Sequence, residues 1–336
     1  MFRATRPALR RHPAYWCAAR AIGLMLALPV FSQPSAAQAW PDKPIRLVVN
    51  FPAGGAADTL ARGLTPGLTA ALKRPVVVDN RPGANGIMGA DVVAKSPADG
   101  YTFLLTSGGA IAIDPFLYTK MPYDPQRDLT PVASVALVRV FLLVHPSVPA
   151  RTLAEFVSYL RANPGKLSFG SAGNGSTPHI AAEMFKRAGK LDAVHVPYKG
   201  AAPALSDLLS GQVQFMFDPG PGLQHVAAGK LRLLAVASGK RAAQYPDVPT
   251  LAEAGLPGVN GDSTFGVYAP AGTPRAVVER MNKEINQAVA ANVLQDSVNR
   301  MGGAVAPLSI QAFAERQDAD RARYGSFIKA AGMTLD

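Results

Sequence analysis

The chain has 336 residues and a formal net charge of +11, with 34 Lys and Arg against 23 Asp and Glu. The basic residues are scattered rather than gathered in blocks with interleaved aromatics, which argues against a nucleic-acid-binding protein. The one cysteine, Cys17, lies near the N-terminus, so the rest of the chain has no disulfide, thiolate nucleophile or cysteine metal ligand.

The N-terminal segment predicts a signal peptide over residues 1–39. Five arginines precede or flank an apolar run at 21–31, and small residues ending in Ala37-Gln38-Ala39 follow. A membrane anchor or a disordered tail is the alternative, but the run is too short for a stable transmembrane span. Cleavage after Ala39 would leave 297 residues with a formal charge of +6. That length suffices for one large or two medium domains, and the modest positive charge suits either an anionic small molecule or ordinary solubility.

In the first part of the mature chain, strand-like apolar runs alternate with helix-compatible stretches. The predicted strands cover residues 45–50, 75–79 and 101–106. The predicted helices cover residues 59–72, where Pro66 is expected to kink or end the helix, and 88–94.

The same alternation continues through the second part. The predicted strands cover residues 138–144, 166–170, 193–196, 213–217, 231–238 and 265–269. The predicted helices cover residues 152–162, 178–186 and 203–209, one begins near Thr273 with Pro274 as its first residue, and two long helices fill the C-terminus. Thr152 and Glu155 form a capping-box pattern. The alternation predicts parallel α/β sheets in two similar units, with a ligand cleft beyond the carboxyl ends of their strands.

The stretch FPAGGAADTLAR, residues 51–62, places two glycines between a strand and a helix. It is neither a P-loop nor a dinucleotide-binding fingerprint. Gly54 and Gly55 would let backbone amides approach a ligand closely, and the helix N-terminus would favour an anion. A tight turn without a ligand explains the pattern equally well. Asp58 is expected either to cap the helix or to meet a ligand group.

The stretch SAGNGSTPH, residues 171–179, forms a second glycine-rich turn between a strand and a helix. It offers hydroxyl and amide side chains beside free backbone groups. Two such loops, one in each α/β unit, indicate one shared anion site. His179 on the following helix is expected to be packed or capping rather than a base.

For Lys199 and Asp218, the sequence allows either a structural or a ligand-binding role. Lys199 precedes a third helix N-terminus and either pairs with a carboxylate or is merely solvated. Asp218 ends a buried strand and either holds the following loop or meets polar ligand atoms.

No catalytic pattern is found in the sequence. It lacks a G-x-S-x-G or H-E-x-x-H motif and any outstanding pair of acids, and its five histidines show no metal-ligand spacing. We therefore expect a protein that is not an enzyme and that uses no cofactor and no metal.

Long ordered segments resemble a known family. They include WPDKPIRLVVNFPAGGAADTLAR, VVVDNRPGANGIMGADVVAKSPADGYTFLL, FGSAGNGSTPHIAAEMFK and HVPYKGAAPALSDLLSGQVQFMFD, with YDPQRDLTPVA, GKLRLLAVASGKRAAQYPDVPTLAEAG and APAGTP. These segments resemble the tripartite tricarboxylate transporter solute-binding proteins, the Bug family of periplasmic receptors. The resemblance runs from Trp40 to Asp336.

The resemblance implies an α/β protein with a type II periplasmic binding protein-like fold, in which two α/β domains surround an interdomain ligand cleft. Domain 1 is expected at residues 40–140 plus 264–336, and domain 2 at residues 141–263. The implied ligand is a small carboxylate, whether a tricarboxylate, dicarboxylate, amino acid or aromatic acid, held largely by backbone amides and ordered water. The implied partners are the membrane permease subunits of the transporter, with the receptor itself monomeric and periplasmic.

By motif position, the resemblance assigns ligand contacts to three glycine-containing loops and to two strand ends. The assigned residues are Phe51, Pro52, Gly54, Gly55, Asp58, Thr59, Thr106, Ser107, Ser171, Gly173, Asn174, Gly175, Ser176, Thr177, His179, Lys199, Gly200, Ala201 and Asp218.

Two segments depart from the family pattern. Residues 218–222 are richer in glycine and proline than expected, and residues 262–265 lack a tryptophan common there. Both are expected near the cleft mouth, which leaves the identity of the ligand open. Two other functions also stay open: an orphan binding component that signals through a sensor protein and, less favoured, an exported hydrolase.

Overall fold

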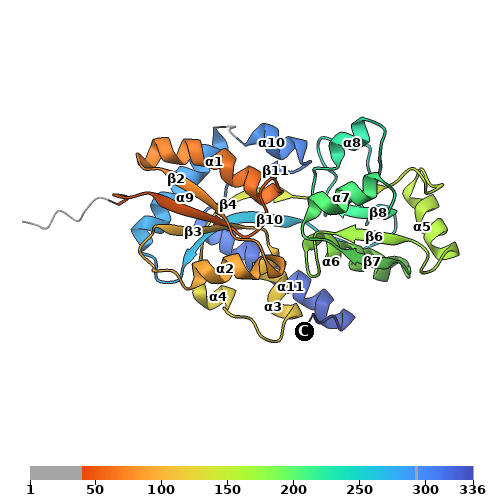
Figure 1. Cartoon of the computed structure of the whole chain (residues 1–336), viewed down its shortest axis with the longest axis horizontal. Coiled ribbons are helices and arrows are strands. Elements are labelled where there is room, and N and C mark those ends of the chain that lie inside the picture. The colour runs from red at the N-terminus through yellow and green to blue at the C-terminus, as the bar shows by residue number, and fades with distance from the viewer. Residues whose placement is uncertain (1–39, 292–293, 336) are drawn as a thin grey trace, which may run out of the picture. The chain divides into compact units, whose positions relative to one another are not determined.

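The computed structural model describes residues 40–291 and 294–335. The predicted signal peptide, with Cys17, lies outside the described residues. Chain from Trp40 onward forms a single compact unit. Its described residues build two β-sheets, each flanked by helices (Figure 1).

The first sheet combines the N-terminal strands with strands from the C-terminal part. Its six strands are, in spatial order, β11 (Ala304–Val305), β4 (Leu129–Val138), β10 (Ser263–Pro270), β3 (Thr102–Thr106), β1 (Ile45–Val49) and β2 (Val76–Asn80). β1 runs parallel to β2 and β3, whereas β10 runs antiparallel to β3 and β4. Its helices are α1 (Ala56–Leu72), α2 (Ile87–Ala94), α3 (Asp114–Leu117), α4 (Pro125–Asp128), α9 (Arg275–Ala290), α10 (Gln295–Arg300) and α11 (Ile310–Ala331), with short 3₁₀ and π segments at Ala84–Gly86 and Gly109–Ile113.

The second sheet is built from the middle of the chain. Its five strands are, in spatial order, β7 (Val194–Pro197), β6 (Ser168–Ser171), β8 (Phe215–Asp218), β5 (Val140–Val144) and β9 (Arg232–Ala237). β6 runs parallel to β7 and β8, and β5 runs antiparallel to β8 and β9. Its helices are α5 (Leu153–Ala162), α6 (Thr177–Gly189), α7 (Ala201–Leu209) and α8 (Leu223–Ala227).

Both sheets are mixed, so the prediction of parallel sheets is wrong. The reason lies in the strands that link the two sheets. β4 leads into β5 through Arg139, and the chain returns after β9 into β10. A chain that leaves a sheet and comes back beside its exit strand must run in the opposite direction, and β10 therefore pairs antiparallel with β4. The predicted strand at 138–144 is two strands, because the chain changes sheet at Arg139.

Helix α1 also differs from the prediction, since it begins at Ala56 and continues through Pro66. A proline inside a helix leaves the carbonyl four residues earlier without its hydrogen-bond donor. Here that carbonyl belongs to Arg62, and the Thr65 hydroxyl donates to it at 3.0 Å. Pro66 itself faces solvent, so its ring displaces no buried neighbour.

Other local predictions hold with small shifts. The capping box of Thr152 and Glu155 is present at the start of α5, with both reciprocal hydrogen bonds. α9 begins at Arg275, so Pro274 is its N-cap rather than its first residue.

Apolar clusters pack both α/β domains. Leu47, Val49 and Phe103 pack against α1 and α9 beside the first sheet. Phe156 of α5 and Phe169 pack on Phe215 at the second sheet, in a cluster that also includes Tyr324 and Ile328 of α11. The domain boundaries given above stay a prediction. Within the described residues no helix is long and apolar enough to cross a membrane.

Candidate functional site

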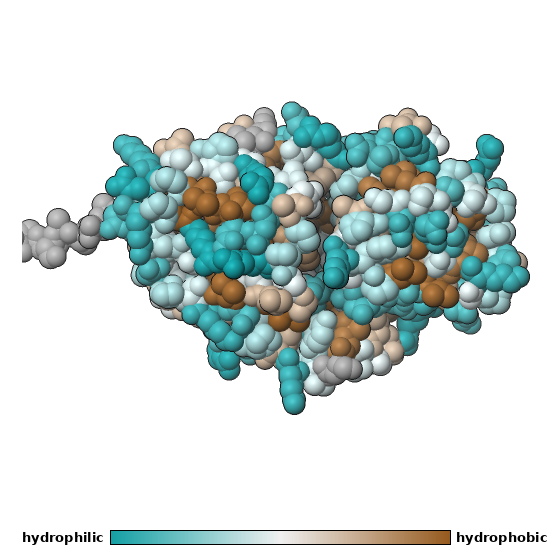
Figure 2. Space-filling view, in the orientation of Figure 1, coloured by the Kyte–Doolittle hydropathy of each residue, from teal (hydrophilic) through white to brown (hydrophobic). Residues whose placement is uncertain are grey.

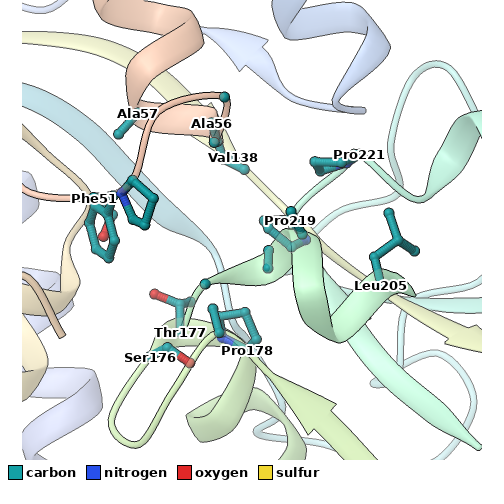
Figure 3. A pocket seen from close by; sticks show the side chains of 18 of the residues that line it. Phe51, Ala56, Ala57, Val138, Ser176, Thr177, Pro178, Leu205, Pro219 and Pro221 are labelled. Carbon is teal, nitrogen blue, oxygen red and sulfur yellow. The ribbon is translucent and has the colours of Figure 1, made fainter. Parts of the chain in front are cut away.

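A cavity of about 410 Å³ lies at the carboxyl ends of strands from both sheets. Its walls come from the loops after β1, β2, β3, β6, β7 and β8, from helices α7 and α8, and from the crossing strands β4, β5 and β10. Figure 3 shows Phe51 on one side, Leu205 and Pro221 on the other, and Ser176 and Thr177 between them. On the molecular surface a furrow separates the α1 side from the α7 side (Figure 2). A cavity of this volume accommodates a small molecule.

The loop after β1 brings the backbone of residues 52–55 to the cavity. Gly54 adopts φ +81°, a conformation that side chains disfavour, and Gly55 is the N-cap of α1 without a side-chain cap. Asp58 does not cap the helix from the N-cap position; it lies in the first turn and accepts a hydrogen bond of 2.9 Å from the Gly54 amide. The glycine turn is therefore stabilised by a side chain in the first turn of α1, that of Asp58.

The carboxylate of Asp58 has three partners. Besides Gly54, it accepts hydrogen bonds from Arg62 at 2.9 Å and from Asn80 at 3.0 Å. Burial alone would raise the pKa of Asp58, but these hydrogen bonds and the Arg62 charge outweigh burial and hold the pKa below its usual value. Asp58 is thus ionised and fully occupied in holding the loop.

The loop after β6 is shaped by two left-handed glycines and a serine cap. Gly173 and Gly175 adopt φ +124° and +76°. Ser176 is the N-cap of α6; its hydroxyl accepts from the His179 amide and donates to the Gly173 carbonyl at 2.7 Å. These bonds present Ser176 and Thr177 to the cavity.

Two histidines stack behind this loop. His179 and His195 lie with ring centroids 4.0 Å apart. His179 Nδ1 accepts from the Gly175 amide at 3.0 Å, and His195 Nε2 lies 2.6 Å from the Ser171 hydroxyl. Burial lowers the pKa of His179 to about 3 and that of His195 to about 4, with smaller contributions from neighbouring cationic groups. Both rings are neutral at physiological pH, and His179 is a packed residue, as expected.

The loop after β7 supplies the third helix N-terminus. Gly200 is the N-cap of α7 and has φ +110°. A Cβ atom placed on Gly200 would lie 3.7 Å from Cγ of Pro52. The first and third loops therefore approach each other across the cavity. Lys199 lines the cavity, is exposed, and forms no hydrogen bond or ion pair within the described part of the chain.

Asp218 holds the loop after β8. Its Oδ2 accepts hydrogen bonds of 2.8 Å from the amides of Gly220 and Gly222. Complete burial raises the pKa of Asp218 to about 6 against the opposing effect of these bonds. The turn presents Pro219 and Pro221 to the cavity (Figure 3).

Ten of the residues predicted to contact a ligand line the cavity: Phe51, Pro52, Gly54, Gly55, Ser107, Ser176, Thr177, Lys199, Gly200 and Ala201. The other nine lie behind or beside its walls: Asp58, Thr59, Thr106, Ser171, Gly173, Asn174, Gly175, His179 and Asp218. For Asp58, Ser171, His179 and Asp218, the hydrogen bonds described above show a role in supporting the loops. A direct ligand contact from any of the nineteen stays a prediction.

The structure adds wall residues that sequence reasoning missed. Asn85 lines the cavity from the loop after β2, and its only sequence signal is the Asn-Gly pair in a predicted loop. Leu205 and Leu209 enter from α7, and His225 from α8. Nothing in the local sequence distinguishes these leucines from ordinary core residues, because only the packing of α7 turns them toward the cavity.

The electrostatics of the cavity favour an anion. The N-termini of α1, α6 and α7 all border it, and each carries a partial positive charge. α1 and α7 offer unpaired backbone amides, whereas at α6 Pro178 has no N–H and the Ser176 hydroxyl accepts from the His179 amide, which leaves the amide of Thr177. Among the described residues that line it, Lys199 is the one side chain with a permanent charge. Groups of acids, histidines or cysteines placed to hold a metal ion are absent from the described residues.

These features define a solute-binding protein with two α/β domains around a ligand cleft. Residues 60–333 match the family described as the tripartite tricarboxylate transporter family receptor, and the chain belongs to this family. The family consists of solute-binding receptors rather than enzymes. The predicted family membership and the type II periplasmic binding protein-like fold are thus confirmed.

The chain is similar to known relatives over most of its own length and most of theirs. BugT of Bordetella pertussis is 37% identical over 283 residues, which cover 84% of this chain and 87% of BugT. The structure of Rpa4515 from R. palustris with adipate is similar with a TM-score of 0.83 and 37% identity, covering 88% of this chain and 100% of that one. MatC from Rhodopseudomonas palustris with bound malate gives a TM-score of 0.80 and 31% identity, covering 86% and 99%.

Proposed function

We propose that this receptor is exported to the periplasm, where it captures a small carboxylate and delivers it to a membrane permease of the tripartite tricarboxylate type. The observation that carries the proposal is the convergence of three helix N-termini, those of α1, α6 and α7, on one cavity. Unpaired amides at such termini bind carboxylates without a dedicated cation. The two loops that face each other through Pro52 and Gly200 suit closure of the domains around the ligand.

The comparisons support the carboxylate class. Two of the similar structures carry adipate and malate, and both ligands are small carboxylates. The predicted signal peptide at 1–39 supports export, and the family description supports the permease as partner.

Binding is tested by a thermal-shift screen against a panel of carboxylates, using protein freed of co-purified ligand by unfolding and refolding. A ligand that binds only the folded state raises the melting temperature in a saturable way. Gly55→Val should abolish the shift, because the added side chain would enter the cavity where a carboxylate approaches the backbone. The variant is expected to fold, since Gly55 has an ordinary φ of −78° and its side-chain site meets only the Pro52 carbonyl, at 3.4 Å.

Gly239→Val is the matched control. Gly239 is exposed, does not line the cavity, and has room for a side chain, with its nearest neighbour at 3.5 Å. It should retain the ligand shift. A panel that gives no shift with the wild-type protein would contradict the proposal.

Delivery to a permease is tested by uptake of the labelled acid in cells that lack either the receptor or the permease. Both deletions should abolish high-affinity uptake. Uptake that persists without the receptor, while ligand binding is intact, would instead indicate a sensor component.

A further inference from the structure

The charges around the cavity limit the charge of its ligand. Lys199 is the one permanently charged side chain in the described walls, and none of these wall residues is an aspartate or glutamate. Of the carboxyl groups behind the walls, Asp58 pairs with Arg62, Asp218 accepts from its own loop through Oδ2, and Asp114 accepts from Asn85 through Oδ1. Oδ1 of Asp218 and Oδ2 of Asp114 have no partner among the described residues, but both groups are fully buried behind the walls. A buried charge is stable only when a counter-charge or hydrogen-bond donors meet it. A ligand ammonium group would therefore lack a carboxylate partner in the walls, and a ligand carboxylate placed away from the helix N-termini and Lys199 would meet mainly apolar wall residues.

One side of the cavity is apolar. We call the apolar arm six apolar wall residues that come from the crossing strands, from α7 and from the loop after β8: Val140, Leu205, Leu209, Pro219, Pro221 and Phe265. Ser206 of α7 and Ser263 of β10 also line the cavity from these elements. Figure 3 shows Leu205, Pro219 and Pro221 together on the side opposite Phe51. A carboxylate that moves from water to such walls loses hydration and finds no hydrogen-bond donors there. A hydrocarbon group that moves from water to the same walls is stabilised by the hydrophobic effect.

We propose that the cavity selects a monocarboxylate with an uncharged, apolar body, such as an aromatic or alicyclic acid, over tricarboxylates, dicarboxylates and amino acids. The carboxylate sits at the N-termini of α1, α6 and α7, and the body lies in the apolar arm. The inference rests on the proposed function, because it takes the carboxylate seat as given. The cavity volume of about 410 Å³ lies within the range of small-molecule sites and has room for such an acid.

The test is calorimetric titration of the purified protein, freed of bound ligand, with benzoate, cyclohexanecarboxylate, citrate, adipate and glutamate. Benzoate or cyclohexanecarboxylate should bind at least tenfold more tightly than each of the other three. A smaller preference, or the reverse order, overturns the inference while leaving a carboxylate receptor in place. No binding of any of the five acids overturns both the inference and the proposed function.

A second variant places a charge in the apolar arm. Leu209→Lys adds a cation at the half-buried end of α7, a position that tolerates a long polar side chain. It should weaken binding of the favoured monocarboxylate at least tenfold and strengthen binding of adipate. Unchanged monocarboxylate affinity would show that the ligand body does not occupy the arm and would overturn the inference.

Val194→Lys is the matched control for the added charge. Val194 is 52% exposed, lies in the same α/β domain on β7 and does not line the cavity. This variant should leave the order and the strength of binding unchanged. A tenfold loss here too would mean that overall charge, not the arm, governs affinity, which also overturns the inference.

Discussion

The side-chain amide of Asn85 donates a hydrogen bond of 2.8 Å to Oδ1 of Asp114, which links a wall of the cavity to a buried carboxyl group. Asp114 is fully buried, and its Oδ2 has no hydrogen-bond partner among the described residues. Burial raises the pKa of Asp114 to about 8, although the Asn85 hydrogen bond opposes the shift. The group is therefore neutral at pH 7 and places no negative charge behind an anion site.

Asp114→Asn should remove one component of the pH dependence of stability. The folded protein holds the Asp114 proton between pH 3.8 and about 8, where the unfolded chain has lost it. This contribution to stability is therefore lost as pH rises through that window, by at most about 1.4 kcal/mol per pH unit. Thermal unfolding from pH 5 to 8 should show a flatter profile for the variant than for the wild-type protein.

Asp247→Asn is the control for this experiment, because Asp247 is exposed and does not contact the cavity. Its profile should follow that of the wild-type protein. Parallel profiles for wild type and Asp114→Asn would contradict a neutral Asp114.

The stacked histidines predict the opposite pH dependence. Their folded pKa values, about 3 and about 4, lie below the unfolded value of 6.5, so the unfolded chain binds protons first as pH falls. Their contribution to stability is present above pH 6.5 and is lost as the pH falls from 6.5 to about 4 for His195 and to about 3 for His179. His195→Gln keeps a group that reaches the Ser171 hydroxyl but does not titrate. Its stability deficit relative to wild type should shrink as the pH falls through this window, measured by urea unfolding at each pH; a constant deficit would contradict the prediction.

The part of the fold that follows from local chemistry could be predicted from the sequence. Glycine turns at 54–55 and 173–175, the Thr152 capping box and the buried strands all depend on neighbours in the chain. The mixed sheets could not be predicted, because the pairing of β10 with β4 depends on residues more than a hundred positions apart. The continuity of α1 through Pro66 also depended on one side-chain hydrogen bond, from Thr65, that propensity does not include.

The candidate site divides in the same way. Loop residues such as Gly54 and Ser176 carry a sequence signal, since turns and helix caps restrict residue type. Wall residues such as Leu205 and Asn85 do not, because they reach the cavity only through the packing of α7 and the loop after β2. The sequence left two roles open for Asp58 and Asp218, loop support and ligand contact. Only the hydrogen bonds in the structure assign both residues to loop support.

Asp218→Ala should loosen the loop that carries Pro219 and Pro221. It leaves the amides of Gly220 and Gly222 without their acceptor in a buried place, which costs about 1–3 kcal/mol of unfolding free energy. Ligand affinity should fall with it, because both prolines line the cavity. Asp218→Asn, which keeps a carbonyl acceptor, should lose less of both, and equal losses in the two variants would argue against the hydrogen bonds as the cause.

Lys199→Met should weaken carboxylate binding about two- to fivefold and should reduce its salt dependence. The ammonium is exposed and free of other partners in the described chain, so its contribution is that of a solvent-screened pair. Titrations at low and high salt measure both effects. Lys283→Met, an exposed lysine away from the cavity, should change neither, and a wild-type salt response in Lys199→Met would exclude Lys199 as a ligand partner.

The most direct test of the central claim is a crystal structure of the protein with its tightest-binding acid. We expect the carboxylate oxygens to accept hydrogen bonds, directly or through one water, from backbone amides at the starts of α1, α6 and α7. The body of the ligand should lie against Leu205, Leu209 and Pro221. A carboxylate seated away from these helix N-termini, or a ligand bound outside the cavity, would contradict the account.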